Sequence, residues 1–140
     1  VTAETWWPDR PVAGGSAANN GSIVLHVRVG DLSALLLGDI EREAGSAIRL
    51  ALRRDPRMSA AVEDLDVLKM PHHGSSNVDE GLMEAVAAPV AIISVGADNT
   101  YGHPTPTALA WAARHGSRVL RTDRDGDVAV LDGPAVVTSG

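Results

Sequence analysis

The sequence has no cysteine and no phenylalanine, and only 3% of its 140 residues are aromatic. The absence of cysteine excludes disulfide bonds and thiolate zinc sites, and it leaves no indication of a redox compartment. Because aromatic side chains are scarce, we expect a core of alanine, valine, leucine and isoleucine. No apolar stretch approaches the roughly 20 residues that a membrane-spanning helix needs. The longest candidate covers only residues 33–38.

The beginning of the chain lacks the basic and apolar regions of a signal peptide, and it has no initiator methionine. We therefore expect a piece excised from a longer protein, with a naturally shortened module as the alternative. The net charge of −6 argues against a broad basic surface for duplex DNA. A nucleic-acid enzyme is still compatible with this charge, because a metal ion can supply local positive charge.

Hydrophobic residues make up 44% of the chain and charged residues 21%, which is typical of one soluble globular domain. Residues 1–20 contain prolines, glycines and small polar residues, which predicts a lead-in arm without a regular element. Trp6 and Trp7 are expected to dock this arm onto the core, with stacking on a ligand as the alternative. The domain itself is expected to occupy residues 21–140.

The pattern of apolar and polar residues predicts six strands and three helices. The strands are expected at residues 23–29, 32–37, 66–70, 90–95, 119–122 and 128–131, and the helices at 41–54, 79–87 and 105–115. A Gly-Asp turn at residues 30–31 predicts a hairpin of the first two strands. A second turn at residues 125–126 is expected to join the last two. Strands that alternate with helices predict an α/β fold, and the two hairpins predict a mixed sheet.

Polar residues gather where three of these strands end. The first strand end is Gly38-Asp39, the second is Pro71-His72-His73-Gly74-Ser75, and the third is Gly96 followed by Asn99, Tyr101 and His103. Alone, each segment has an ordinary explanation as a turn, a solvated loop or a helix start. In α/β sheets, however, the carboxyl ends of strands converge on ligands. One carboxylate and up to three imidazoles would suit Zn²⁺ or Mn²⁺, so together the segments favour a metal or phosphate site.

Four segments carry a resemblance to a known family. They read LLLGDI at 35–40, DVLKMPHHGSS at 66–76, IISVGADNTYGHP at 92–104 and RTDRDG at 121–126. In this order they resemble the C-terminal metallo-β-lactamase-like domain of ComEC-type DNA-internalisation (competence) proteins, over about residues 20–131. The resemblance implies a metallo-β-lactamase-like αββα sandwich with a mixed sheet, of which this chain is the incomplete second half.

The resemblance also implies roles for individual residues. Asp39 matches the aspartate that bridges two metal ions, and His73 matches the histidine that completes the second metal site, with His72 as the alternative. The other member of the pair would lie near the scissile phosphate. His103 would face the substrate phosphate, where it could stabilise charge or protonate the leaving oxygen. The residues expected to support these groups or position the substrate are Ser75, Asn99 and Tyr101.

The family's principal metal motif, His-x-(His or Asp)-x-Asp-His, is absent from the sequence. The nearest string, at residues 26–31, has Arg28 at a ligand position and no closing histidine. We expect His26 to be a partly exposed strand histidine and His115 a surface residue near a helix C-terminus. The complete domain would hold two Zn or Mn ions. Since catalytic sites usually need three protein ligands, binding by this chain is expected to be weak or absent, and the chain alone inactive.

Three functions remain open from the sequence. The first is part of a metal-dependent nuclease or phosphodiesterase that acts on DNA during uptake, on a single strand or the strand that is not imported. Its parent would be a cell-membrane protein, with this domain soluble and extracytoplasmic, and this segment itself would not contact the membrane. The second is a hydrolase of the same fold for a small phosphodiester. The third is a non-catalytic interaction module that forms a homodimer through an uncovered sheet face.

Overall fold

The computed structural model of the chain describes residues 1–131, 133 and 135–140, and its centre is a six-stranded sheet in the order β1-β2-β3-β4-β5-β6. The strands are β1 (Thr2–Trp7), β2 (Val24–Val29), β3 (Leu32–Leu36), β4 (Val67–Lys69), β5 (Val90–Ile93) and β6 (Arg118–Arg121). The pairs among β1, β2 and β3 are antiparallel, and those from β3 to β6 are parallel. The predicted α/β fold with a mixed sheet is confirmed.

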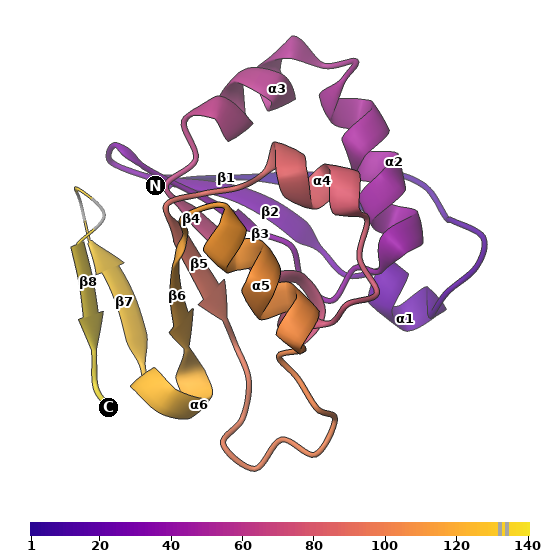
Figure 1. Ribbon diagram of the computed structural model, residues 1–140. Coiled ribbons are helices and arrows are strands. Elements are labelled where there is room, and N and C mark those ends of the chain that lie inside the picture. Colours follow the sequence, from indigo (N-terminus) through magenta and orange to yellow (C-terminus); the bar gives the residue numbers. More distant parts are fainter. Residues whose placement is uncertain (132, 134) are drawn as a thin grey trace.

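Helices cover one face of this sheet (Figure 1). The helices are α1 (Ala17–Asn20), α2 (Arg42–Leu52), α3 (Pro56–Glu63), α4 (Glu80–Ala85) and α5 (Pro106–Arg114). Helix α3 was not predicted from the sequence, where Asp55-Pro56 after residues 41–54 indicates only the end of a helix. Asp55 also caps the next helix by accepting a hydrogen bond from the Arg57 N–H (2.9 Å), and proline suits the first helical position. No helix in the described part of the chain is long and apolar enough to cross a membrane.

The core between sheet and helices is mainly aliphatic, as predicted. Its fully buried side chains include Val24, Leu35, Leu37, Ile48, Leu68, Leu82, Val86 and Ile93. Trp6 and Trp7 of β1 and Trp111 of α5 complete this core.

The expectation that residues 1–20 form no regular element is wrong. Residues 2–7 form β1, an edge strand of the main sheet that pairs with β2. The docking of Trp6 and Trp7 is confirmed, because only 8% and 2% of their surfaces remain exposed. The indole Nε1–H of Trp7 donates to the carbonyl of Asn20 at 2.6 Å. An edge strand whose first four residues are exposed shows no apolar alternation, so its pairing was not visible in the sequence.

The predicted pairing of the last two strands is also wrong. Strand β6 instead adds to β5 in parallel, and α6 (Thr122–Asp125) separates it from β7 (Val128–Leu131). Strand β7 pairs with β8 (Ala135–Thr138) in a separate two-stranded sheet. The Thr122 hydroxyl both donates to the Val95 carbonyl and accepts from the Val95 N–H (2.7 and 2.8 Å), which turns the chain after β6 toward β5.

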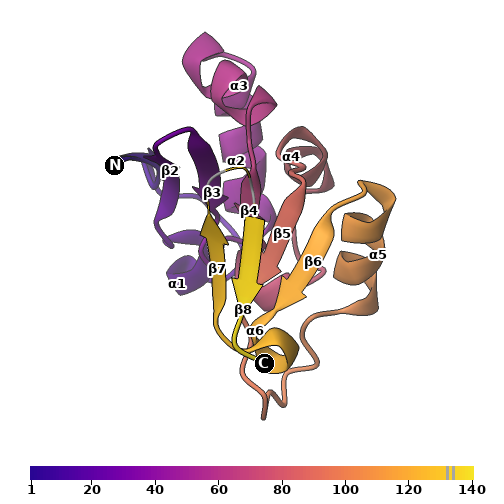
Figure 2. The ribbon, with the colours of Figure 1, turned by 90° about the vertical axis from the view of Figure 1, so that its left-hand side faces the viewer.

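The two-stranded sheet lies on the face of the main sheet opposite the helices (Figure 2). Its residues Val128, Val130 and Val136 pack against a small cluster on β3–β6 that includes Val67, Val90 and Leu120. The expectation of an uncovered sheet face is therefore wrong for this part of the sheet.

Candidate metal and phosphate site

The carboxyl ends of β3, β4 and β5 meet at one edge of the sheet, and hydrogen bonds link the segments that follow them. The carbonyl of Gly38 accepts from the backbone N–H of His72 (3.0 Å) and from Lys69 Nζ (3.1 Å). The carbonyl of Gly74 accepts from both the N–H and the hydroxyl of Thr105 (2.9 and 3.1 Å). The three polar segments singled out in the sequence are thus side by side in the structure.

Asp39 and His73 face each other at this edge. His73 Nδ1 lies 2.6 Å from the carbonyl oxygen of Ser94, which can only accept, so Nδ1 donates. A neutral imidazole with its proton on Nδ1 has a lone pair on Nε2. That nitrogen lies 3.5 Å from Asp39 Oδ1, and both side chains are about 40% exposed (43% and 39%). A carboxylate oxygen and an imidazole nitrogen, both on partly exposed side chains, therefore lie close together at this edge.

The separation of these two atoms fits ligands of one metal ion. At 3.5 Å it exceeds the 2.7–3.2 Å range of N–H···O hydrogen bonds. Two ligand atoms each about 2.1 Å from a tetrahedral zinc ion lie about 3.4 Å apart. The described residues contain no group of three or more histidine, aspartate or glutamate side chains placed around one point. Asp39 and His73 alone are fewer than the three protein ligands that a catalytic metal site usually has.

His72 lies between His73 and His103, with ring centroids 6.4 and 5.6 Å from theirs. The Nδ1 atoms of His72 and His103 are buried and have no hydrogen-bond partner among the described residues. Burial, and then the positive charges that His72 and His73 can carry, hold the pKa of His103 below its usual value. His103 is thus favoured as a neutral ring. Unpaired buried nitrogens are costly, and two of them lie at this edge of the sheet.

The backbone of this segment is strained where it presents the histidines. His72 and His73, in the short 3₁₀ turn η1 (Pro71–Gly74), have φ of 46° and 54°. Such left-handed conformations are uncommon for residues other than glycine, and in ordered structures they cluster at functional sites. Gly74 follows with φ 81°, and a Cβ there would lie 2.6 Å from Pro104 Cβ. The close approach of Pro104 brings the His103 segment against the His72-His73 turn.

Two charged residues at the site were not identified from the sequence. Lys69 Nζ lies 3.9 Å from Asp39 Oδ1, and burial lowers the pKa of Lys69 against the attraction of Asp39. Glu41 Oε1 lies 3.9 Å from His72 Nδ1. A lysine inside an otherwise apolar strand was a usable signal for the first. Glu41 at a helix start looks like any acidic N-terminal residue, so the sequence carried no signal for it.

The three predicted supporting residues differ in their surroundings. The Asn99 amide donates to the carbonyl of His103, and its Oδ1 accepts from the N–H of Tyr101 (3.0 Å), so Asn99 shapes the loop that carries His103. Ser75 is buried, accepts from the N–H of Asn77 (3.1 Å) and lines a separate cavity between α4 and α5. Tyr101 is 86% exposed.

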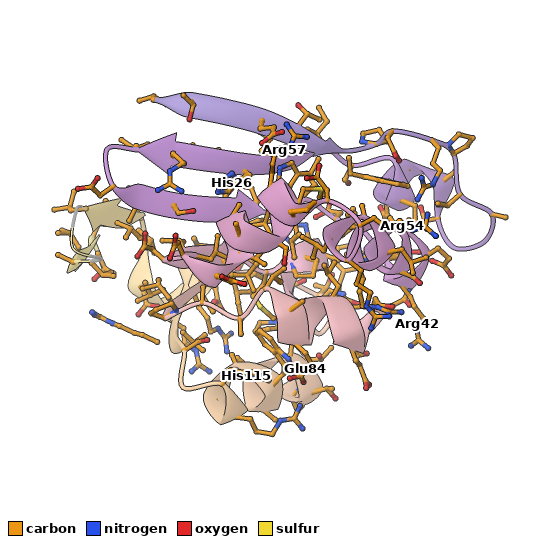
Figure 3. The ribbon with its side chains drawn as sticks, turned by 90° about the horizontal axis from the view of Figure 1, so that it is seen from above. His26, Arg42, Arg54, Arg57, Glu84 and His115 are labelled. Atoms are coloured by element: carbon orange, nitrogen blue, oxygen red, sulfur yellow. The ribbon has the colours of Figure 1, made fainter. Side chains whose placement is uncertain are left out.

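The remaining histidines, His26 and His115, lie outside the site. His26 is buried rather than partly exposed: its Nε2 lies 2.9 Å from Ser33 Oγ, and its ring stacks on Trp6. Burial accordingly lowers the pKa of His26. His115 follows the last residue of α5, as expected, and lies beside Glu84 of α4 (Figure 3).

Protonated His115 is expected to stabilise the α4–α5 contact. Its Nδ1 lies 2.8 Å from the Trp111 carbonyl and its Nε2 2.6 Å from Glu84 Oε2, so both acceptors are satisfied only by an imidazolium. The Trp111 carbonyl and then Glu84 raise the pKa of His115, against the smaller opposing effects of burial and, last, of Arg114. A pKa that is higher in the folded than in the unfolded protein stabilises the fold. The stabilisation is complete at pH values below the pKa in the unfolded protein, about 6.5, and it is lost as the pH rises through the pKa in the folded protein.

The measurement is urea unfolding of the wild type and His115→Gln at about pH 5.5 and pH 8.5. The difference in unfolding free energy between the two proteins should be larger at the lower pH. Comparing the two proteins at each pH cancels the opposite effects of His26 and His103. A difference that is the same at both pH values would contradict this role of His115.

Two curated proteins are similar to this chain in sequence. One is ComE operon protein 3 of Bacillus subtilis (strain 168), which is 37% identical over 114 residues, or 81% of this chain. The other is Competence protein ComA of Neisseria gonorrhoeae, which is 31% identical over 109 residues, or 77% of this chain. The matched segments make up only 14% and 15% of those proteins, so the chain corresponds to a small part of each. No family model matches the chain. No solved structure matches it either.

Proposed function

We propose that this chain is part of a metal-dependent phosphodiesterase or nuclease domain, of metallo-β-lactamase-like fold, in a bacterial DNA-uptake protein. The named relatives support the connection with competence, and in both of them the similar segment belongs to a much longer protein. The parent of this chain would be a membrane protein that acts on DNA, either a single strand or the strand that is not imported.

The pairing of Asp39 with His73 is the observation that carries the enzymatic part of this proposal. Their facing atoms are too far apart for a hydrogen bond and are spaced like two ligands of one ion. The Ser94 carbonyl orients His73 as carbonyls orient histidine ligands in metal sites, by accepting the proton of the other ring nitrogen. A bound divalent ion supplies charge neutralisation and an activated water for phosphodiester hydrolysis, and Zn or Mn suits these ligands.

The neighbouring side chains provide what a phosphodiester substrate needs besides the ion. His72 and His103 present two imidazoles beside the pair of ligands, and an imidazole can accept a proton from water or, when it carries the proton, donate to a phosphate oxygen. Lys69 adds a positive charge beside Asp39. Asn99 holds the loop that carries His103. The site thus combines an ion-binding pair with groups that stabilise negative charge on oxygen.

A hydrolysis assay with Mn²⁺ or Zn²⁺ tests the proposal. Since two ligands are fewer than the usual three, this chain alone should show no turnover above that of Asp39→Ala, with bis(4-nitrophenyl) phosphate or DNA. A longer piece of its parent protein that supplies the remaining ligands should hydrolyse these substrates, and Asp39→Ala in that piece should abolish turnover. Robust turnover by this chain alone would contradict the expectation that its set of metal ligands is incomplete. A metal-loaded parent protein without hydrolase activity would contradict the function.

The same assay separates DNA from a small phosphodiester as the substrate. The net charge of −6 disfavours duplex DNA, so single-stranded DNA should be cleaved faster than duplex DNA of the same sequence. Cleavage of the small diester together with complete inactivity toward both forms of DNA would favour the small-substrate alternative.

A further inference from the structure

Glu41 is placed to act on His72 rather than to cap its own helix. It is the N-cap residue of α2, but its side chain makes no capping hydrogen bond. Asn20 takes over that role, because its Oδ1 accepts from the backbone N–H groups of Glu41 (3.1 Å) and Ala44 (3.3 Å). The carboxylate of Glu41 is therefore available for other contacts, although the residue is only 7% exposed.

The buried carboxylate is fixed in place by the segment before β2. Its Oε2 accepts from the N–H of Ser16 and its Oε1 from the Asn19 amide, each at 2.8 Å. Both oxygens of the carboxylate thus accept a hydrogen bond, an arrangement that suits its ionised form. Glu41 is thus an ionised acceptor with a defined position, and it carries no proton to donate.

His72 offers the matching partner. Its Nδ1 is buried, has no hydrogen bond and lies 3.9 Å from Glu41 Oε1. The backbone N–H of His72 donates to the Gly38 carbonyl at 3.0 Å, which anchors the residue next to the start of α2. A neutral imidazole can direct either an N–H or a lone pair at this carboxylate. The N–H is attracted by the negative charge, whereas the lone pair is repelled by it.

We propose that Glu41 is a positioning residue that keeps the proton of neutral His72 on Nδ1. The lone pair of His72 is then on Nε2, the nitrogen that remains to bind a metal ion or to accept a hydrogen bond from a water molecule. The use of that lone pair in catalysis rests on the function proposed above. The tautomer itself depends only on Glu41 and His72.

The test is the tautomer of His72 in the metal-free chain, read from the chemical shifts of its two ring nitrogens by ¹⁵N NMR at about pH 8.5, where histidine is neutral. In the wild type we expect the Nδ1–H form to predominate. In Glu41→Gln, the ratio of the Nδ1–H to the Nε2–H form should fall at least about fivefold, since the glutamine amide has no net charge to attract the N–H and repel the lone pair. Glutamine keeps the shape of the side chain and can still accept from Ser16.

Glu43→Gln is the matched control. Glu43 also lies in the first turn of α2 and also bonds to the segment before β2, through the Asn20 amide (3.1 Å), but it makes no ion pair with His72. This variant should leave the ratio of tautomers unchanged. A wild-type His72 with its proton on Nε2 would overturn the proposal, and this result requires no variant to fold. An unchanged ratio in Glu41→Gln would overturn it as well.

A parallel titration with Mn²⁺ keeps this proposal separate from the proposed function. If the wild type shows the Nδ1–H form but Asp39 and His73 bind no ion, the role of Glu41 stands and the metal site fails. If the ion binds but His72 carries its proton on Nε2, the metal site stands and the role of Glu41 fails.

Discussion

Alanine in place of Gly74 is expected to lower the free energy of unfolding by about 3 kcal/mol. Gly74 has φ 81°, a left-handed conformation that costs alanine roughly 1–2 kcal/mol. Its new Cβ would also lie 2.6 Å from Pro104 Cβ and 3.1 Å from Pro104 Cα, so the two segments must move apart. Overpacking of this kind typically adds 1–3 kcal/mol. Urea denaturation of the purified protein measures the change.

Gly102→Ala is the control for this prediction. Gly102 has a similar φ of 75° in the same region, but nothing lies within 4 Å of a Cβ placed there. It should therefore show the backbone cost alone, roughly 1–2 kcal/mol. Equal destabilisation by the two substitutions would contradict the close contact between Gly74 and Pro104. The contact also predicts that Gly74→Ala, unlike Gly102→Ala, changes the NMR signals of the His72 ring.

Alanine in place of Trp7 should have the largest effect on stability, a loss of about 4 kcal/mol. The indole is 2% exposed in the main core, and its removal leaves a large cavity. The substitution also leaves the carbonyl of Asn20 without the 2.6 Å hydrogen bond from Nε1. Because the stabilising side chain comes from β1, this result would show that the first residues are integral to the fold.

Trp7→Phe separates the two contributions. Phenylalanine keeps much of the apolar volume and loses the N–H donor, so this variant should lose roughly 1–3 kcal/mol, mainly from the unpaired carbonyl. A loss below about 1 kcal/mol in Trp7→Ala would mean that residues 1–20 are a dispensable arm. Ligand stacking on Trp7, the other interpretation of the sequence, is incompatible with a side chain this deeply buried.

Most of the sheet could be predicted from the sequence because its strands carry local signals. The hairpin at Gly30-Asp31 and the apolar segments that form β4 and β5 each have a pattern that is independent of the rest of the chain. The errors fall where pairing depends on tertiary contacts. Strand β1 is held in place by its pairing with β2. The separate β7–β8 sheet is held in place by its packing on Val67, Val90 and Leu120. Neither contact leaves a periodic pattern in the sequence.

The candidate site shows the same division between local and tertiary information. Asp39, His72, His73 and His103 were identified because they follow strands whose carboxyl ends meet, a relation that the order of elements already implies. The sequence did not reveal that His73 bonds to the Ser94 carbonyl, or that Glu41 faces His72. Those relations depend on the left-handed turn at residues 72–74 and on the segment that contains Ser16 and Asn19.

The most direct test of the central claim is a titration of this chain with Mn²⁺, followed by the paramagnetic broadening of its NMR signals. We predict that broadening begins around Asp39 and His73, even where binding by two ligands is weak. Asp39→Ala and His73→Ala should each weaken the effect at least about tenfold. Asp31→Ala, at the hairpin turn that precedes β3, should leave it unchanged. Broadening that begins elsewhere, or that persists unchanged in both site variants, would contradict a metal site at Asp39 and His73.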